Sequence, residues 1–368
     1  MKSVPFFNYP HVFRSYEEQF KKAFHDVGNR GAFIMQSDLV EFEKSIAEYV
    51  GVKYALGVAN ATDGLQMGMM AGGIGPGDEV IFCSHTMVAT ASAIHFAGGI
   101  PVPIETGPDH LIDIDSIEAA ITSKTKAICP TQLNGRTANM DAIREIAVKH
   151  GLLIFEDAAQ ALGSKFKGKC AGTFGVASCI SLYPAKILGC LGDGGLVLTN
   201  DDSVYEKLHQ MRDHGRGHDG DVHMWGLNSR LDNLQAAFLN VQFKDYPAVT
   251  SRRRQLASLY QDRLSRIEQL SLPVAPDADP DHFDVFQNYE IEAENRDELK
   301  IYLAEKGIGT LIQWGGKAVH QFTKLGFNQK LPKTESLFKK MIMIPMNMSM
   351  TDEDLHYVCD SIESFYAN

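Results

Sequence analysis

Hydrophobic positions in the first 155 residues alternate between two spacings. Apolar residues recur at helical intervals from Leu39 to Val50, which predicts an amphipathic helix. Short, continuously apolar runs such as Leu152 to Phe155 are typical of strands covered on both faces. The pattern predicts helices over 39–50, 62–70, 88–97 and 141–150, and strands over 53–58, 79–82, 100–104, 126–129 and 152–155. This alternation predicts an α/β fold with a mostly parallel sheet flanked by helices.

The pattern changes near Asn233, where longer helical stretches begin. The expected elements beyond this point are a helix over 252–264, a strand over 289–291 and helices over 296–306 and 352–365. A chain of 368 residues exceeds what one hydrophobic core usually serves. We therefore expect a large α/β domain over residues 1–245 and a smaller C-terminal α+β domain over residues 246–368.

Composition narrows the classes of function. Lys and Arg number 35 against 46 Asp and Glu, and this acidic balance disfavours nucleic acid as a partner. The N-terminus lacks the apolar core of a signal peptide, and no run approaches the roughly 20 apolar residues of a membrane span. We expect a cytoplasmic protein without a membrane partner. The six cysteines have irregular spacing without a C-x-x-C pair, so they are expected to be reduced and buried.

Two residues suggest the chemistry. Asp157 follows an apolar run and should lie at the carboxyl end of a strand, where ligands of open α/β sheets bind. Lys186 follows the next apolar run and precedes a glycine-rich stretch, so it can enter the same crevice. Alone, Asp157 could cap a helix and Lys186 could be a surface lysine. Together they are the pair that holds pyridoxal phosphate: an acid for the ring nitrogen and a lysine for the aldehyde.

An anion site is also indicated. The start of the helix after Asn60 to Gly64 offers free amides, and Ser181 lies ahead of the lysine, so both could hold a phosphate. The alternative is an ordinary helix cap.

Five motifs in order resemble one known family. They are Asn60 to Leu65, Thr86 to Thr90, Glu156 to Gln160, Ser181 to Gly195, and Asn228 to Ala237. Together they resemble the DegT/DnrJ/StrS family of sugar aminotransferases, which depend on pyridoxal phosphate and have fold type I. The resemblance runs from roughly Phe33 to the C-terminus.

The resemblance implies a role for each matched residue. Lys186 would bind pyridoxal phosphate covalently, Asp157 would contact its ring nitrogen, and Gln160 would contact its ring hydroxyl. The phosphate would be held by Thr62, Asp63 and Ser181, and by Asn228 from the other subunit of a homodimer with a shared active site. The position that often carries an aromatic residue over the ring is Met87 here. Either Met87 covers the ring or His85 does.

The reaction follows from the retained lysine, which favours transamination over dehydration. An amino acid, by family habit glutamate, would leave its amino group on the cofactor as pyridoxamine phosphate. A sugar carbonyl would then accept the group. Candidates to bind an anionic acceptor are Arg252 to Arg254, Arg212, His214 and Gln313 to Lys317. The plainer interpretation of the triple arginine is a set of solvated helix charges.

The acceptor itself stays open at this point. Residues 307–317, with Arg212 to Gly217 and Gln287 to Tyr289, resemble the branch that makes 8-amino-3,8-dideoxy-octulosonate for lipopolysaccharide. A nucleotide-linked keto sugar is the alternative.

Three other readings are weaker. Gly73 to Gly77 lacks the spacing of a dinucleotide-binding loop and precedes a strand, which argues against a nicotinamide dehydrogenase. A non-catalytic regulator that binds the cofactor would lack the lysine or carry a DNA-binding module. His214, His218 and His223 lie in a glycine-rich stretch that predicts a loop, so no metal is expected.

Overall fold

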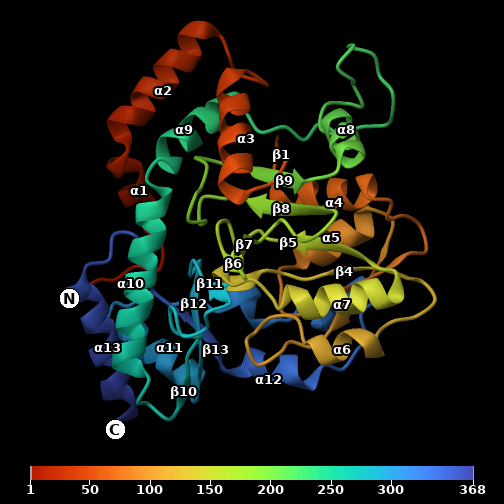
Figure 1. The fold of residues 1–368 in the computed structure, drawn as a ribbon. Coiled ribbons are helices and arrows are strands. Elements are labelled where there is room, and N and C mark those ends of the chain that lie inside the picture. The colour runs from red at the N-terminus through yellow and green to blue at the C-terminus, as the bar shows by residue number, and fades with distance from the viewer. Residues whose placement is uncertain (1, 368) are drawn as a thin grey trace.

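The computed structural model describes residues 2–367, and its centre is a seven-stranded sheet (Figure 1). The strands lie in the order β1 (Tyr54–Val58), β9 (Gly195–Thr199), β8 (Ala177–Ser181), β5 (Leu153–Asp157), β4 (Thr125–Cys129), β2 (Glu79–Cys83) and β3 (Ile100–Ile104). The pairs from β8 to β3 are parallel, and β9 runs antiparallel to both of its neighbours. The prediction of a mostly parallel sheet is confirmed.

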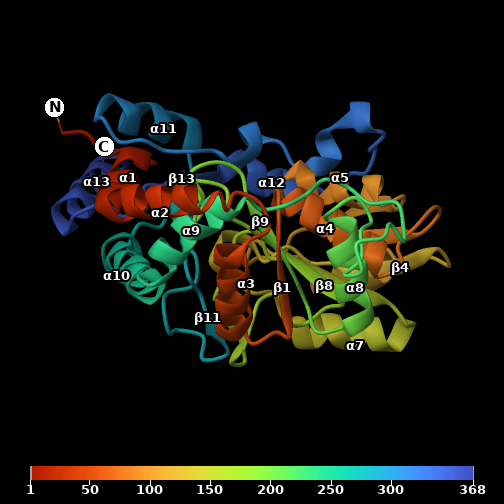
Figure 2. The same cartoon turned by 90° about the horizontal axis from the view of Figure 1, so that it is seen from above.

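Helices cover both faces of this sheet (Figure 2). One face carries α4 (Ala61–Ala71), α5 (Val88–Phe96) and α8 (Asp202–Met211). The other carries α3 (Ser37–Val50), α6 (Ile114–Ala119), α7 (Met140–His150) and α9 (Asn233–Phe243). Double coverage explains why the strands are apolar at consecutive positions. We call residues 37–243 the large region.

Residues 246–366 form a second layered unit, which we call the small region. A three-stranded antiparallel sheet of β10 (Leu270–Ser271), β12 (Tyr289–Ala293) and β13 (Met341–Ile344) packs against helices. The helices are α10 (Tyr246–Leu264), α11 (Arg296–Glu305), α12 (Pro332–Lys340) and α13 (Asp352–Tyr366). Strand and helix are therefore mixed here, while the domain boundary after residue 245 stays a prediction.

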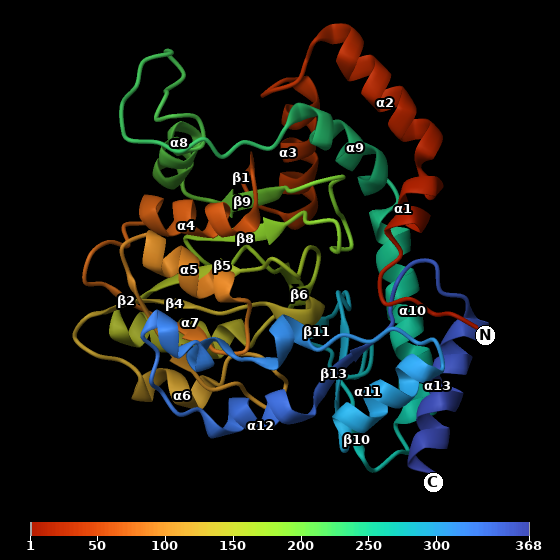
Figure 3. The same cartoon turned by 180° about the vertical axis from the view of Figure 1, so that it is seen from behind.

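The N-terminal helices were not foreseen from the sequence. α1 (Tyr9–Ser15) and α2 (Glu17–Arg30) run along α9 and α10, as Figure 3 shows from behind. Val4 forms a bridge with Ile308 and packs into the core of the small region. The first residues of the chain thus lie beside its last helix.

Most predicted elements of the large region match the observed bounds within two residues. Besides α1 and α2, the elements that hydrophobic spacing did not reveal are α6, α8, α12, β9, β13, the short strands β6 (Lys165–Phe166), β7 (Lys169–Cys170), β10 and β11 (His282–Phe283), and four 3-10 turns (133–135, 313–316, 319–321 and 323–325). All six cysteines are buried and free, as expected. No helix within residues 2–367 has the length and apolar character needed to cross a bilayer.

Candidate active site

A cavity of about 520 Å³ lies at the carboxyl ends of β5 and β8. Its walls come from the strand ends, from the first turns of α4 and α5 and from one residue of the small region. The residues that line it include Asn60, Thr62, Thr86, Met87, Thr131, Asp157, Gln160, Cys179, Ser181, Tyr183, Lys186 and Trp314. Lys186 and Asp157 therefore share one cavity, as the sequence predicted.

Asp157, the last residue of β5, is 6% exposed, and both of its carboxylate oxygens are hydrogen-bonded. Oδ2 accepts from the Thr90 hydroxyl at 2.6 Å, and Oδ1 accepts from the Ala159 N–H at 3.2 Å. The hydroxyls of Thr90, Thr86 and Thr131 form a continuous line at 2.8 and 3.0 Å. Since Thr90 donates to the carboxylate, it accepts from Thr86, which in turn accepts from Thr131. The line fixes the orientation of the carboxylate.

Lys186 follows β8 and is half-buried. Burial lowers the pKa of its amine to about 8, and the negative charge of Asp157 only partly opposes this effect. The small region holds the loop that carries the lysine. The Gln287 side chain accepts a hydrogen bond from the Ile187 N–H and donates one to the Ala185 carbonyl, both at 2.9 Å. A lysine with this pKa is able to act as a nucleophile near neutral pH.

The first turn of α4 faces the cavity through Asn60, Ala61 and Thr62. Asn60 caps the helix by accepting from the Asp63 N–H at 2.8 Å. The carboxylate of Asp63 accepts from the Ser229 hydroxyl at 2.7 Å, and Asp63 does not line the cavity. Thr62 and Ser181 are therefore placed to meet an anion, whereas the Asp63 side chain and amide are already engaged.

Gln160 lines the cavity next to Asp157. Its Oε1 accepts from the Asn134 N–H at 2.9 Å and from Asn288 Nδ2 at 3.1 Å. With the oxygen engaged twice, the amide nitrogen is the end that can donate into the cavity.

Met87 and His85 are placed differently. Met87 is 53% exposed and lines the cavity. His85 is buried outside it, where Nδ1 donates to the His110 carbonyl at 2.9 Å and the ring meets Trp314 edge-on. Trp314 itself lines the cavity, so His85 supports an aromatic wall and Met87 forms part of the wall directly.

Asn228 lies on the loop that follows α8, and its side chain is exposed. It does not line the cavity of its own chain. A contribution from this residue would have to reach another subunit, so its role stays a prediction.

The arginines proposed for an anionic acceptor serve the fold instead. Arg252 to Arg254 lie within α10 rather than at its start, because the helix begins at Tyr246. Arg253 donates to the carbonyls of Phe286 and Gln287, both at 2.7 Å, and Arg254 donates to the Asp284 carbonyl at 2.8 Å. The prediction of solvated helix charges is also wrong for Arg253, which is 6% exposed.

Two further acceptor candidates are corrected by their contacts. Arg212 is buried against Glu43 at 2.5 Å and also donates to the Gly57 carbonyl. Gln313 is buried in a hydrogen-bond network with Glu290, while Lys317 and His214 are exposed away from the cavity lining. Within residues 2–367 no cluster of three or more His, Cys, Asp or Glu side chains is arranged to hold a metal.

The sequence did not reveal several lining residues. Thr131, Cys179 and Tyr183 were missed as part of the cavity, whereas Trp314 belongs to the stretch Gln313 to Lys317 that was named for the acceptor and does line it. Thr90 lies in one of the matched motifs, yet its contact with Asp157 spans 67 positions and has no local signal. These residues come together only through the strand order.

The cavity suits pyridoxal phosphate by its donors and acceptors. It combines a half-buried lysine of lowered pKa, a fixed carboxylate, an amide donor and a helix N-terminus flanked by Ser181. These four groups match the aldehyde, ring nitrogen, ring hydroxyl and phosphate of the cofactor.

Comparison with known proteins decides the family. The sequence model of the DegT/DnrJ/EryC1/StrS aminotransferase family matches residues 14–363. The chain belongs to this aminotransferase family. It is 38% identical over 368 residues to a "pleiotropic regulatory protein" of Geobacillus stearothermophilus, with 99% of each chain covered. It is 35% identical to a dTDP-3-amino-3,4,6-trideoxy-α-D-glucose transaminase of Streptomyces venezuelae, covering 98% of this chain and 96% of that one.

A solved structure agrees with the assignment. The structure of S. venezuelae DesV in complex with a ketimine intermediate superposes with a TM-score of 0.95 at 34% identity and full coverage of both chains. The protein is thus a transaminase of the α/β fold type I, and its cofactor is pyridoxal phosphate, which becomes pyridoxamine phosphate while carrying the amino group. The nicotinamide reading is excluded.

Proposed function

We propose that this aminotransferase moves an amino group from an amino acid to the keto group of a nucleotide-linked sugar. The Streptomyces relative is named for a dTDP-sugar, which supports a nucleotide-linked acceptor. The octulosonate acceptor lacks such support, and Arg212, which belongs to one of the stretches that suggested it, is engaged within the fold. Glutamate as donor and a cytoplasmic location remain predictions.

The observation that carries the proposal is the shared cavity of Lys186 and Asp157. When bound, pyridoxal phosphate supplies an aldehyde that takes up amines and a ring that withdraws electrons. Lys186 Nζ would hold the cofactor covalently and, once released, carry the proton that leaves the donor Cα. Asp157 would accept a hydrogen bond from the ring nitrogen and keep it protonated. Gln160 would donate to the ring oxygen, and Thr62 and Ser181 would bind the phosphate.

The absorbance of the bound cofactor tests both the chemistry and the acceptor. Purified protein loaded with pyridoxal phosphate should show a band at roughly 410 to 430 nm, typical of a lysine-bound cofactor. The band should bleach with glutamate and return with nucleotide-linked keto sugars. An 8-keto octulosonate is the matched competitor. Return of the band with the octulosonate alone would overturn the acceptor, and absence of any band would overturn the chemistry.

We also propose that the active site is shared in a homodimer, because Asn228 is exposed and outside its own cavity. Subunits carrying Lys186→Ala and subunits carrying Asn228→Ala should each be impaired alone. Mixed dimers would contain one site with both residues intact. Random pairing makes about half of the dimers mixed, so mixing should restore roughly a quarter of wild-type activity. Failure to restore activity in a proven mixed dimer would show that Asn228 does not act across subunits.

A further inference from the structure

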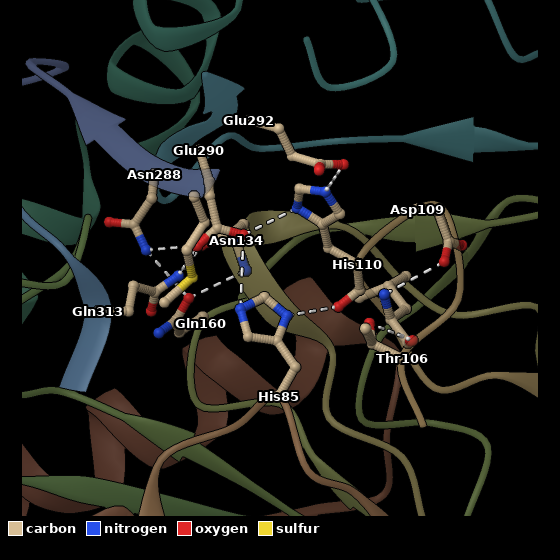
Figure 4. Close-up of polar contacts among 12 residues, drawn as sticks. His85, Thr106, Asp109, His110, Asn134, Gln160, Asn288, Glu290, Glu292 and Gln313 are labelled. Atoms are coloured by element: carbon tan, nitrogen blue, oxygen red, sulfur yellow. Dashed lines mark hydrogen bonds and ion pairs between the residues drawn. The ribbon is translucent and has the colours of Figure 1, made fainter. Parts of the chain in front are cut away.

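A network of side-chain amides connects the small region to Gln160 (Figure 4). It begins at Glu290 in β12, which is 2% exposed. Oε1 of Glu290 accepts from Asn134 Nδ2 at 3.1 Å, and Oε2 accepts from Gln313 Nε2 at 2.6 Å. Glu290 therefore meets Asn134 of the large region and Gln313 of the small region at the same carboxylate.

Two amides in this network use both of their hydrogens. Asn288 Nδ2 donates to Asn134 Oδ1 at 2.9 Å and to Gln160 Oε1 at 3.1 Å. Gln313 Nε2 donates to Asn134 Oδ1 at 3.0 Å as well as to Glu290. Since a side-chain amide has two N–H donors, neither nitrogen has a hydrogen left over. All hydrogens on these two nitrogens are therefore paired, and the order of donors and acceptors along the network has one direction.

That direction is set by the carboxylate. An ionised Glu290 accepts hydrogen bonds and donates none, so Asn134 must turn its nitrogen toward it. The oxygen of Asn134 then faces Asn288, whose nitrogen in turn meets the oxygen of Gln160. In this arrangement Gln160 presents its oxygen to the network and its nitrogen to the cavity.

A second contact holds the Asn134 backbone. The Asn134 N–H donates to Gln160 Oε1, and Asn134 has a left-handed backbone with φ 55°. Its side-chain bond to Glu290 therefore also anchors the backbone donor that Gln160 uses.

The surroundings keep Glu290 ionised. His110 lies between Glu290 at 2.9 Å and Glu292 at 3.4 Å, and both of its ring nitrogens face carboxylates. Burial opposes the charge of His110, but these carboxylates outweigh it and raise its pKa to about 10. Burial alone would raise the pKa of Glu290, yet the facing His85, with Nε2 at 3.5 Å, and His110 hold it well below the usual value. The carboxylate is an acceptor at any ordinary pH.

We propose that Glu290 is a positioning residue for transamination, which acts through Asn134 and Asn288 to turn the Gln160 N–H toward the ring oxygen of the cofactor. This inference rests on the proposed function of the cavity. Because Glu290 and Asn288 belong to the small region, docking of that region completes the environment of the ring oxygen. Lys186 and Asp157 do not touch this network.

Glu290→Gln tests the proposal, with Glu292→Gln as the matched control. Glutamine keeps the shape of Glu290 but brings an N–H donor where only an acceptor fits. The neighbouring amides are then no longer restricted to one orientation of their nitrogen and oxygen. Glu292 lies two residues along the same strand and contacts His110 without touching the amides. The measurement is a spectroscopic pH titration of the lysine-bound cofactor band.

The expected shift has a definite sign. A hydrogen bond to the ring oxygen stabilises its negative charge, which is largest after the lysine link has lost its proton. Weakening that bond therefore raises the apparent pKa of the band, by about half a unit to one unit if one hydrogen bond is lost. We expect this rise in Glu290→Gln together with a lower kcat and a nearly unchanged KM for the donor. Glu292→Gln should titrate like wild type.

The outcomes separate this inference from the proposed function. A wild-type protein without the band refutes the proposed function. A wild-type band with an unshifted titration in folded Glu290→Gln overturns only the role of Glu290, as does an equal shift in Glu292→Gln.

Asn134→Gly provides a second test if Glu290→Gln fails to fold. Glycine adopts the left-handed backbone of position 134 without strain, and the variant keeps the N–H that Gln160 uses. We expect the band pKa to rise in this variant too, because the side-chain connection to Glu290 is cut. A wild-type titration would contradict the proposal.

Discussion

The cavity has two polar ends, one at Asp157 and the other at Gln160. These residues are three positions apart, yet different parts of the molecule hold them in place. Asp157 takes its hydrogen bonds from Thr90 and Ala159, both in the large region. Gln160 takes one of its bonds from Asn288 in the small region. The first end is complete once the large region has folded, whereas the second also needs the small region in place.

This difference separates the residues proposed to carry out the reaction from the residues proposed to adjust the ring oxygen of the cofactor. The groups proposed to hold the cofactor covalently and to keep its ring protonated come from the large region, Lys186 from the loop after β8 and Asp157 from the end of β5. The groups that tune the ring oxygen lie where the two regions meet, and such a joint can respond to a bound substrate. Changes at the two ends should therefore differ in size and in what they alter.

The largest effect is expected from Lys186→Ala, which removes the group common to both ends. The variant should fold and bind cofactor without a covalent link, and amino transfer should fall by roughly 10²- to 10⁴-fold because the proton carrier is lost. Single-turnover assays with the donor would measure this. Lys169→Ala, at an exposed position of β7, is the matched control and should behave as wild type. Substantial turnover in Lys186→Ala would mean that another residue carries the chemistry.

Asp157→Asn should have the next largest effect. The amide keeps the shape but removes the charge that holds the ring nitrogen protonated, and hydrogen bonds to charged groups contribute about 1.5 to 3 kcal/mol. This corresponds to a fall in kcat of about 10- to 100-fold. Steady-state kinetics on folded protein would show it. A wild-type kcat would remove Asp157 from the proposed site.

The pH dependence of cofactor capture should report on the protonation of Lys186. The pKa of Lys186 is lowered to about 8, so the amine is protonated below that pH and free above it. The rate at which apo-protein captures pyridoxal phosphate should rise about tenfold from pH 7 to 9 and then level off. Stopped-flow absorbance measures the rate. A rate that kept rising beyond pH 10 would indicate an ordinary, solvated lysine.

Thr90→Val should have a smaller effect on the same end. It removes the 2.6 Å hydrogen bond to Asp157 and leaves Thr86 without its acceptor. Loss of one such bond lowers kcat by about two- to tenfold. Thr199→Val is the matched control, since this buried threonine of β9 donates to the Val176 carbonyl away from the cavity. An equal loss of activity in both variants would point to general destabilisation instead.

The same contrast explains what the sequence could predict. Lys186, Asp157, Thr62 and Ser181 follow strands or begin helices, and local hydrophobic spacing places such positions. The partners of Gln160 could not be placed, because Asn134, Asn288 and Gln313 are up to 179 positions apart and join only after the small region docks.

The sequence also led to a wrong prediction for the location of a charged side chain. Arg253 looked solvated because its neighbours are charged, yet it lies on the inward face of α10 and pairs with backbone carbonyls. Its burial depends on the packing of α10 against the segment around Phe286, which hydrophobic spacing along α10 does not reveal. β9 was missed for a similar reason, since its glycine-rich approach predicts a loop and one of its antiparallel partners, β1, is distant in sequence.

Asn288→Ala should give the smallest effect and sharpens the comparison most. It removes one of the two donors to Gln160 Oε1 and leaves the Asn134 N–H in place, so kcat should fall only about two- to threefold. The band pKa should rise slightly, while the pH curve of cofactor capture should match wild type because Lys186 depends on burial and Asp157. Asn240→Ala, on α9, loses a 2.9 Å hydrogen bond to the Asp38 carbonyl of α3 and should change neither measurement. A shifted capture curve in Asn288→Ala would show that the two ends are coupled through the small region after all.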